Sequence, residues 1–280
     1  MKFIKYILGL FLAITVQSCF QDFKEPAFNY PESKPDPDMN LYNPEKIKLT
    51  FDTGNFEDES IYQFQVSTYG AGSIIKDAGV QGAAYKGADE SYILINSHDA
   101  IEEQMSDTLS NLKEFTLAIW LNSAKMTGAT AIFSMSNSKT FWGNFDVFFE
   151  NNNSETEAFI KTHLYNGDAE EWAEIRIPEF FNSGWQHLAI TFNSNTSSYK
   201  IWHNGKAVFE KEVKAEGGLV FNNLSSIVVG AIQFQTIPSL TEGASKQDWA
   251  GYYQGMIDGL HFYTKELNKG DIEHLFLNKL

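Results

Sequence analysis

Residues 184–208 read GWQHLAITFNSNTSSYKIWHNGKAV and carry the clearest structural signal in the chain. Around Leu188 and Ile190, apolar residues alternate with smaller or polar ones, which is the period of a β-strand. A second alternating run continues past Asn204 and Gly205, and Asn-Gly is the strongest short-range signal for a two-residue hairpin. The stretch therefore predicts consecutive antiparallel strands.

The same two-residue period recurs along most of the remaining sequence, broken by clusters of Asn, Gly and Ser. Aromatic residues make up 15% of the chain and favour strands over helices. Many short strands separated by turn residues are typical of a sandwich or barrel. Only residues 97–104 and 271–277 are expected to form short helices. We therefore predict an all-β protein, a two-sheet antiparallel β-sandwich of the jelly-roll type, with strands at residues 46–52, 91–96, 114–122, 129–135, 144–150, 157–165, 170–177, 186–193, 198–204, 206–213, 225–232 and 256–263.

The first 18 residues have the features of an export signal. Lys2 and Lys5 precede an apolar run shorter than the ~20 residues that a membrane-spanning helix needs. Ser18 then precedes Cys19, the one cysteine of the chain. This junction resembles the lipobox of bacterial lipoproteins, which implies a signal peptide at 1–18 and lipid attachment at Cys19. The alternative is an ordinary secretory signal with a cysteine there by chance.

Residues 19–45 contain five of the seven prolines and show no apolar periodicity. They predict an extended spacer that would hold a domain at residues 46–280 away from a membrane. Asp22 and Glu25, shortly after the cysteine, resemble the surface-export signal of Bacteroidetes lipoproteins. We expect an outer-membrane lipoprotein of the cell envelope, in the periplasmic leaflet or exposed on the surface.

The formal net charge of −15 limits the partners. Nucleic-acid affinity depends on Lys and Arg neutralising phosphates, so DNA and RNA are not expected partners. Adhesion to an anionic membrane by charge is also disfavoured, which leaves the lipid as the expected membrane contact. Neutral sugars, calcium and basic proteins remain open. With a single cysteine, no disulfide can form within the chain.

Several strings in a fixed order resemble one family. After LTFD (49–52) and YKGADESYI (85–93) come FTLAIWLN, GWQHLAITF and YKIWHNGKAV, followed by GMIDGLHFYTKELNKGDIEHLF from residue 255. Together they resemble the laminin G-like domains of the concanavalin A-like lectin/glucanase superfamily over residues 46–280. Gly259 and His261 stand where these domains commonly have an acidic and a basic residue. The resemblance implies a concanavalin A-like jelly roll.

Some proteins of this superfamily are glycosidases that place Glu-x-Asp-x-Glu on one strand face. The nearest match begins at Glu170, with Trp172 in the place of the helper carboxylate and Glu174 at the last position. These residues share one face with Arg176, because side chains alternate along a strand. Arg176 beside Glu174 is expected to keep that carboxylate ionised. We therefore expect a non-catalytic protein, with glycoside hydrolysis as the weaker alternative.

The same face suits binding. An exposed Trp among charged groups can stack on a sugar ring while its neighbours form hydrogen bonds with the sugar hydroxyls. The alternative is a solvated strand face that one aromatic side chain covers. Aromatic residues in loops are less easily explained as core, unless they close the open edges of the sandwich. The candidate ligand-binding residues are Trp142, Asn144, Glu170, Trp172, Glu174, Arg176, Trp249, Tyr252 and Tyr253.

The family resemblance also implies a structural calcium ion. The corresponding positions are Asp258 and Asp52, with help from Asp58. Calcium takes six to eight oxygen ligands, so these residues supply only part of a shell. A purely hydrogen-bonding role for Asp258 is the alternative.

The anchor, spacer, fold resemblance and loop aromatics together predict a non-catalytic lipoprotein that captures a polysaccharide or other glycan. A protein-binding or adhesion module on the same scaffold, with an outer-membrane protein as partner, is the alternative.

Overall fold

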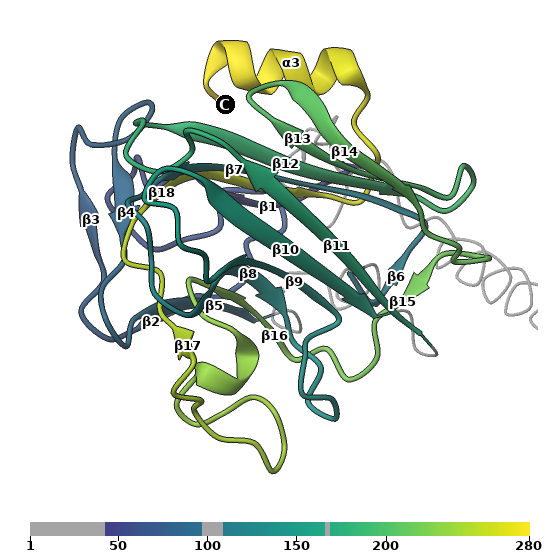
Figure 1. The fold of residues 1–280 in the computed structure, drawn as a ribbon, viewed down its shortest axis with the longest axis horizontal. Helices are drawn as coiled ribbons and strands as arrows, with labels where there is room; N and C mark the ends of the chain where they lie inside the picture. Colours follow the sequence, from purple (N-terminus) through teal and green to yellow (C-terminus); the bar gives the residue numbers. More distant parts are fainter. Residues whose placement is uncertain (1–42, 97–108, 166–168) are drawn as a thin grey trace, which may run out of the picture. The chain divides into compact units, whose positions relative to one another are not determined.

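The computed structural model describes residues 43–96, 109–165 and 169–280 (Figure 1). Residues 44–280 form one compact unit. The predicted signal peptide, the lipid-attachment residue Cys19, the spacer up to residue 42 and the predicted helix at 97–104 lie outside the described residues. Among the described residues, no helix is both long and apolar enough to cross a membrane.

Two large sheets form the domain, and nearly all of their strands pair antiparallel. Sheet A has the order β14–β13–β12–β7–β18–β4–β3, with β1 beside β18. Its strands are β14 (Lys206–Glu212), β13 (Ser198–His203), β12 (Gln186–Asn193), β7 (Glu114–Asn122), β18 (Met256–Tyr263), β4 (Ala84–Lys86), β3 (Ser73–Ile75) and β1 (Glu45–Leu49).

Sheet B has the order β11–β10–β9–β8–β16–β5–β2, with β17 pairing parallel to β8. Its strands are β11 (Glu170–Ile177), β10 (Ala158–Tyr165), β9 (Phe145–Glu150), β8 (Ala129–Met135), β16 (Ser226–Val229), β5 (Tyr92–Asn96), β2 (Val66–Tyr69) and β17 (Ala250–Gly251). A separate small pair joins β6 (Asn111–Leu112) to β15 (Leu219–Val220).

The predicted all-β sandwich is confirmed, and every predicted strand has a counterpart. The bounds agree at both ends for β7, β8, β11, β12 and β18. Asn204 and Gly205 connect β13 to β14 with φ values of 48° and 77°, as a tight hairpin with two left-handed residues requires. The strands that the sequence pattern missed, such as β3 and β17, have only two to four residues.

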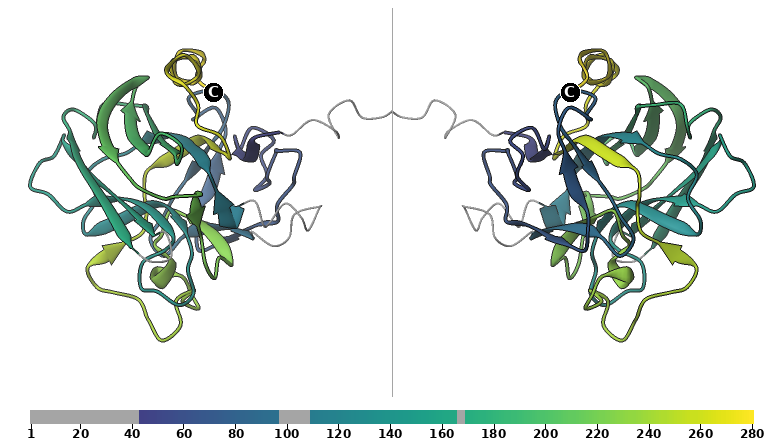
Figure 2. Two further views of the ribbon diagram at one scale, coloured as in Figure 1. Left: turned by 90° about the vertical axis from the view of Figure 1, so that its right-hand side faces the viewer. Right: turned by 90° about the vertical axis from the view of Figure 1, so that its left-hand side faces the viewer.

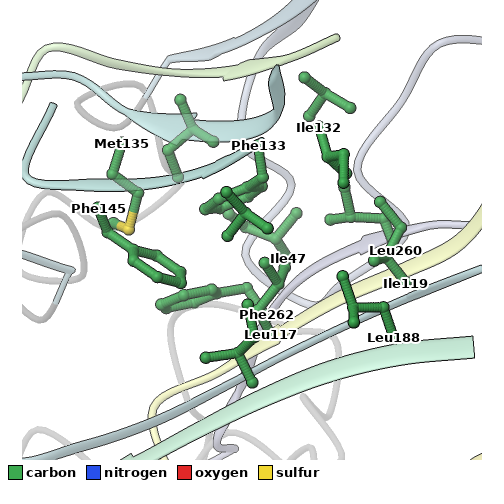
Figure 3. Packing of buried hydrophobic residues seen from close by; sticks show 14 of the residues in the cluster. Ile47, Leu117, Ile119, Ile132, Phe133, Met135, Phe145, Leu188, Leu260 and Phe262 are labelled. Carbon is green, nitrogen blue, oxygen red and sulfur yellow. The ribbon is translucent and has the colours of Figure 1, made fainter. Parts of the chain in front are cut away.

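A group of phenylalanine rings joins the inner faces of the two sheets. Phe115 and Phe262 come from sheet A, Phe133 and Phe145 from sheet B, and none has exposed surface. The Phe133 and Phe262 rings stack with centroids 6.0 Å apart, and those of Phe115 and Phe145 lie 4.9 Å apart. Figure 3 shows Phe133, Phe145 and Phe262 meeting among aliphatic side chains. These contacts fix the two sheets face to face.

Helix α3 (Lys269–Asn278) covers the outer face of sheet A, where Ile272 and Leu275 pack into a small apolar cluster. Asn268 caps the helix with its side chain and forms a capping box with Asp271. The predicted helix at 271–277 is therefore confirmed. Phe276 is only half-buried and stacks on the Trp120 ring at 5.7 Å.

A long segment, residues 231–255, crosses the outer face of sheet B. It contains the 3₁₀ turn η2 (Gln233–Gln235) and the short strand β17. This segment and α3 lie on opposite sides of the sandwich (Figure 2). The two sheets are therefore covered in different ways, one by a helix and the other by an irregular segment.

We predict that Phe133→Ala lowers the free energy of unfolding by about 3–5 kcal/mol, because it leaves a cavity between the sheets. Val208→Ala on β14 removes a side chain that is 41% exposed and should change stability by less than about 0.5 kcal/mol. Urea unfolding followed by tryptophan fluorescence measures both. Equal losses in the two variants would contradict the assignment of Phe133 to the core. If Phe133→Ala does not fold, Phe133→Leu takes its place and should still lose more free energy of unfolding than Val208→Ala.

A second prediction concerns His187, which is fully buried beside Trp120 and whose ring nitrogens have no hydrogen-bond partner among the described residues. Burial, with His261 and His203 nearby, lowers its pKa from 6.5 to about 3. The unfolded chain takes up a proton that the folded state excludes. The free energy of unfolding therefore decreases as the pH falls below about 6.5, by up to about 1.4 kcal/mol per pH unit.

His187→Leu should remove this part of the acid sensitivity, whereas His274→Gln, on the exposed side of α3, should keep it. Urea unfolding of both variants and the parent at pH 7, 6, 5 and 4 measures the difference. A His187→Leu curve parallel to that of the parent would show that the residue does not titrate as described.

Candidate ligand-binding surface

Five aromatic side chains gather on the outer face of sheet B and are called here the aromatic surface: Phe141, Trp142, Trp172, Phe234 and Trp249. The Trp142 ring lies 5.3 Å from that of Trp172 and 6.0 Å from that of Trp249. Phe234 lies 4.3 Å from Phe141 and 5.4 Å from Trp249. Trp249 is 45% exposed and Phe141 38% exposed. The three predicted tryptophans therefore converge on one surface, where Trp249 is exposed and Trp142 and Trp172 are half-buried.

Gln233 holds the loop that carries two of these rings. Its side chain is fully buried and its amide nitrogen donates to the carbonyl oxygens of Thr140 and Phe141, at 2.7 and 3.1 Å. Its oxygen accepts from the backbone N–H of Asn137 at 2.6 Å. Because one side chain ties the 137–142 loop to the 231–255 segment, the aromatic surface is positioned before any ligand arrives.

Beneath Trp142 and Trp172 runs a buried polar row. His163 lies opposite both Trp172 and Asp146 in the strand register, and only 1% of its surface is exposed. Its Nδ1 is 3.3 Å from the Asp146 carboxylate, which also accepts a 2.5 Å bond from the Ser134 hydroxyl. The serine thus bonds to the carboxylate rather than to the histidine. This arrangement does not match a serine nucleophile activated by a histidine base.

The outward face of β11 holds the other predicted group, with Glu170, Glu174 and Arg176 exposed and Trp172 half-buried. The expected pairing of Arg176 with Glu174 is wrong. Glu174 lies 3.2 Å from the amine of Lys161, directly opposite on β10, and Arg176 donates to Glu157 at 3.0 Å. Cross-strand neighbours are closer than residues two apart on one strand, so they capture these charges.

The structure removes Asn144 and Tyr253 from the candidate surface, because both are fully buried. The Asn144 amide donates to the carbonyl oxygens of Ser136 and Asn222, at 2.7 and 2.9 Å. Tyr253 donates to the Met256 carbonyl at 3.0 Å, and burial raises its pKa. Both residues support the backbone.

Tyr252 is also largely covered, with 3% of its surface exposed. Its hydroxyl donates to the carbonyl oxygen of Gln235 at 2.7 Å, and its ring stacks against that of Tyr92. A small part of Tyr252 still reaches the wall of a cleft beside the aromatic surface.

The acidic residues expected to hold calcium lie in two places, with Asp52 and Asp258 lining one cleft and Asp58 another. Both Asp58 oxygens accept bonds from the protein, including the backbone N–H groups of Lys48 and Phe64 at 2.9 Å each. Asp258 accepts from the backbone N–H groups of Val80 and Gly259 at 2.8 and 2.7 Å. Backbone donors aimed at a carboxylate take the lone pairs that a cation would use.

Asp52 and Asp258 are close enough to influence each other. The pKa of Asp258 is raised to about 7. Burial is the largest cause, and the nearby charge of Asp52 adds a smaller effect in the same direction. Asp52 accepts from the backbone N–H of Ala83 at 2.8 Å. Within the described residues, no group of three or more His, Cys, Asp or Glu side chains could hold a metal ion. These donor sets do not fit a calcium ion, and they account instead for the turn at residues 79–83.

A cleft of about 630 Å³ opens where the end of β7, the start of β18 and the segment around β17 meet. Asp248, Ala250 and Gly251 line it, while Trp249 between them belongs to the aromatic surface. The lining also includes Asn122 and residues 124–128. Its volume lies within the usual range for small-molecule sites, about 300–1,000 Å³. The cleft and the aromatic surface therefore share one stretch of chain.

Sequence analysis did not identify Phe234, Gln233 or His163 as part of this region. Phe234 stands in the apolar run AIQFQ, which reads as ordinary core. Gln233 and His163 stand singly, without a motif around them. Only the order of strands in sheet B, and the return of the 231–255 segment across it, bring these residues together.

Comparison with known families gives one match. Residues 91–273 match the Laminin_G_3 family model, described as the concanavalin A-like lectin/glucanases superfamily. A comparison with curated proteins gives no match.

Among solved structures, similar chains include botulinum neurotoxin type C, whose cell entry is described as dependent on interaction with two ganglioside molecules (TM-score 0.59, 18% identity). Others are the binding domain of botulinum neurotoxin DC in complex with rat synaptotagmin II (TM-score 0.58, 14% identity) and the same domain in complex with SialylT (TM-score 0.59, 14% identity). Each alignment covers 85% of this chain and 52% of the other.

The chain thus spans about half the length of these neighbours, and at such low identity the likeness shows a shared fold. The family match covers more than half of the present chain and agrees with the two-sheet architecture. This protein therefore belongs to the laminin G-like domains of the concanavalin A-like lectin/glucanases superfamily.

Proposed function

We propose that this protein is a non-catalytic glycan-binding module that captures a polysaccharide at the cell envelope. The observation that carries the proposal is the convergence of Trp142, Trp172 and Trp249 on the outer face of sheet B. Exposed aromatic groups in contact with one another are unusual on a monomer without a partner and mark binding surfaces. An aromatic ring offers an apolar face to a sugar, and the tryptophan N–H offers a polar edge.

Charged groups beside the rings support the same chemistry. Glu170 next to Trp172 and Asp248 next to Trp249 place exposed carboxylates at the border of the aromatic surface. A carboxylate accepts hydrogen bonds from hydroxyl groups through two oxygens. Hydrolysis is less favoured, because Trp172 separates Glu170 from Glu174 and Lys161 neutralises Glu174.

Protein binding is the second candidate. The aromatic surface is apolar enough to contact a protein, and one structural neighbour is a complex with rat synaptotagmin II. The binding experiment below separates the two, because a protein ligand would leave every polysaccharide without effect. Pull-down from envelope extracts would then be the appropriate measurement.

We further propose that the domain is tethered through a lipid on Cys19 and faces the outer membrane or the cell exterior. The single cysteine of the chain stands directly after a signal-like apolar run and before a proline-rich spacer. A tethered module with a spacer holds captured polysaccharide near the membrane, where envelope proteins could process or import it.

We predict that Trp249→Ala weakens binding to a retained polysaccharide at least tenfold, equivalent to about 1.4 kcal/mol, because the ring supplies open stacking area. Leu277→Ala, which removes the 73% exposed side chain on α3, is the matched control and should bind like the parent. Affinity electrophoresis in gels containing dextran, xylan, galactomannan, polygalacturonate or alginate measures retardation. No retardation of the folded parent by any of these polymers would count against the glycan proposal.

We predict that Cys19→Ser moves the protein from the detergent phase to the aqueous phase in Triton X-114 partitioning after expression in a bacterium that processes lipoproteins. The serine cannot form the thioether to the lipid, so the membrane affinity supplied by the acyl chains is lost. A substitution in the spacer, Ser33→Ala, should remain in the detergent phase. Partitioning of the parent into the aqueous phase would contradict lipidation.

A further inference from the structure

The cleft beside the aromatic surface has a wall chemistry of its own. Of its two lysines, Lys125 pairs with Glu155 at 2.9 Å, whereas Lys86 donates to the neutral Gln254 carbonyl at 2.6 Å and keeps its positive charge. The carboxylates of Asp89 and Asp248 form no hydrogen bond or ion pair with the described residues, and both side chains are exposed. These two carboxylates outnumber the one unpaired lysine, Lys86, so the net charge of the cleft lining is negative.

Neutral polar groups complete the walls. The lining residues include Asn122, Asn182 and Gln254, which have side-chain amides, and Thr127, which has a hydroxyl. Amides and hydroxyls donate and accept hydrogen bonds, so they match a ligand that carries many hydroxyl groups and no charge. An anionic ligand would meet unpaired carboxylates, and placing like charges together is unfavourable.

The cleft adjoins the aromatic surface, because Asp248 and Ala250, on either side of Trp249 in the sequence, both line it. Trp249 directly precedes β17, and the two residues of β17, Ala250 and Gly251, pair with the start of β8 at the cleft. The backbones are tightly apposed there, because a Cβ on Gly128 would lie 2.4 Å from the Trp249 carbonyl oxygen. The shared wall between the two regions is thus one layer of backbone, held by the bond from the Ala129 N–H to that oxygen at 3.0 Å.

We infer that the cleft is a second saccharide subsite, so that the protein takes a linear, uncharged glycan that runs from the aromatic surface across Trp249 into the cleft. This inference rests on the proposed function and adds to it the class of ligand, a neutral polymer rather than a terminal or acidic sugar. The aromatic surface contributes stacking and the cleft contributes hydrogen bonds through Asp248, Asp89 and the amides. Short oligosaccharides fill the first region only, whereas longer ones fill both.

The test uses the full-length chain and neutral oligosaccharides of two to eight units, prepared from whichever neutral polymer retards it. Isothermal titration calorimetry gives the dissociation constant for each length. We expect affinity to rise at least tenfold between the disaccharide and the hexasaccharide. Asp248→Ala should lose this gain and still bind the disaccharide like the parent, whereas Trp249→Ala should weaken binding of both. Glu216→Ala, an exposed acid away from the cleft, is the matched control and should keep the whole gain.

Three outcomes distinguish the ideas. If no polymer binds the folded protein, the proposed function itself is overturned and the subsite with it. If a neutral polymer binds but affinity does not grow with length, or Asp248→Ala behaves like the control, the aromatic surface stands and the cleft subsite is overturned. Equal or stronger retardation by polygalacturonate or alginate would overturn the assignment to uncharged glycans.

Discussion

The contact between phenylalanine rings from the two sheets is the interaction on which the rest of the domain depends. Phe115 and Phe262 on one side meet Phe145 and Phe133 on the other with no exposed surface. A buried hydrogen bond from Tyr199 to Thr162, 2.6 Å long, also crosses between the sheets. Because the inner faces account for stability, the outer faces are free to carry different coverings. The function that we propose lies on one of those outer faces.

The two outer faces are built by different physical means. On sheet A, a capped helix docks through a few apolar side chains. On sheet B, a long segment with little regular structure is held by side-chain amides, and its rings join those of the loop between β8 and β9. Backbone that is fixed by side-chain bonds can adopt turns that a regular strand cannot. This is how aromatic side chains come to stand open to solvent on an otherwise closed sandwich.

The sequence predicted the regular parts of this architecture well, and the site only in part. In strands such as β7 and β12, apolar residues alternate mostly with small or polar ones, so their period and bounds could be predicted. Trp142, Trp172 and Trp249 were each identifiable, but their convergence depends on strand order, which local pattern does not encode. Asn144 and Tyr253 stand near turn residues and looked exposed. Their burial depends on partners as far away as Asn222. The partner of Glu174 likewise lay on a neighbouring strand.

The anchoring of the segment over sheet B has an evolutionary consequence. Gln233 and Gln235 fasten it near its start, and Gln235 also bonds to the carbonyl of Ala250 at 2.8 Å near its far end. The intervening stretch, residues 238–246, contributes no strand to either sheet, and the bond from Gln233 to the Thr241 hydroxyl holds its middle. Insertions, deletions or grafted loops there would alter the surface presented to a ligand and leave the scaffold intact. Specificity in such a domain can diversify at one place, independently of the residues that keep it folded.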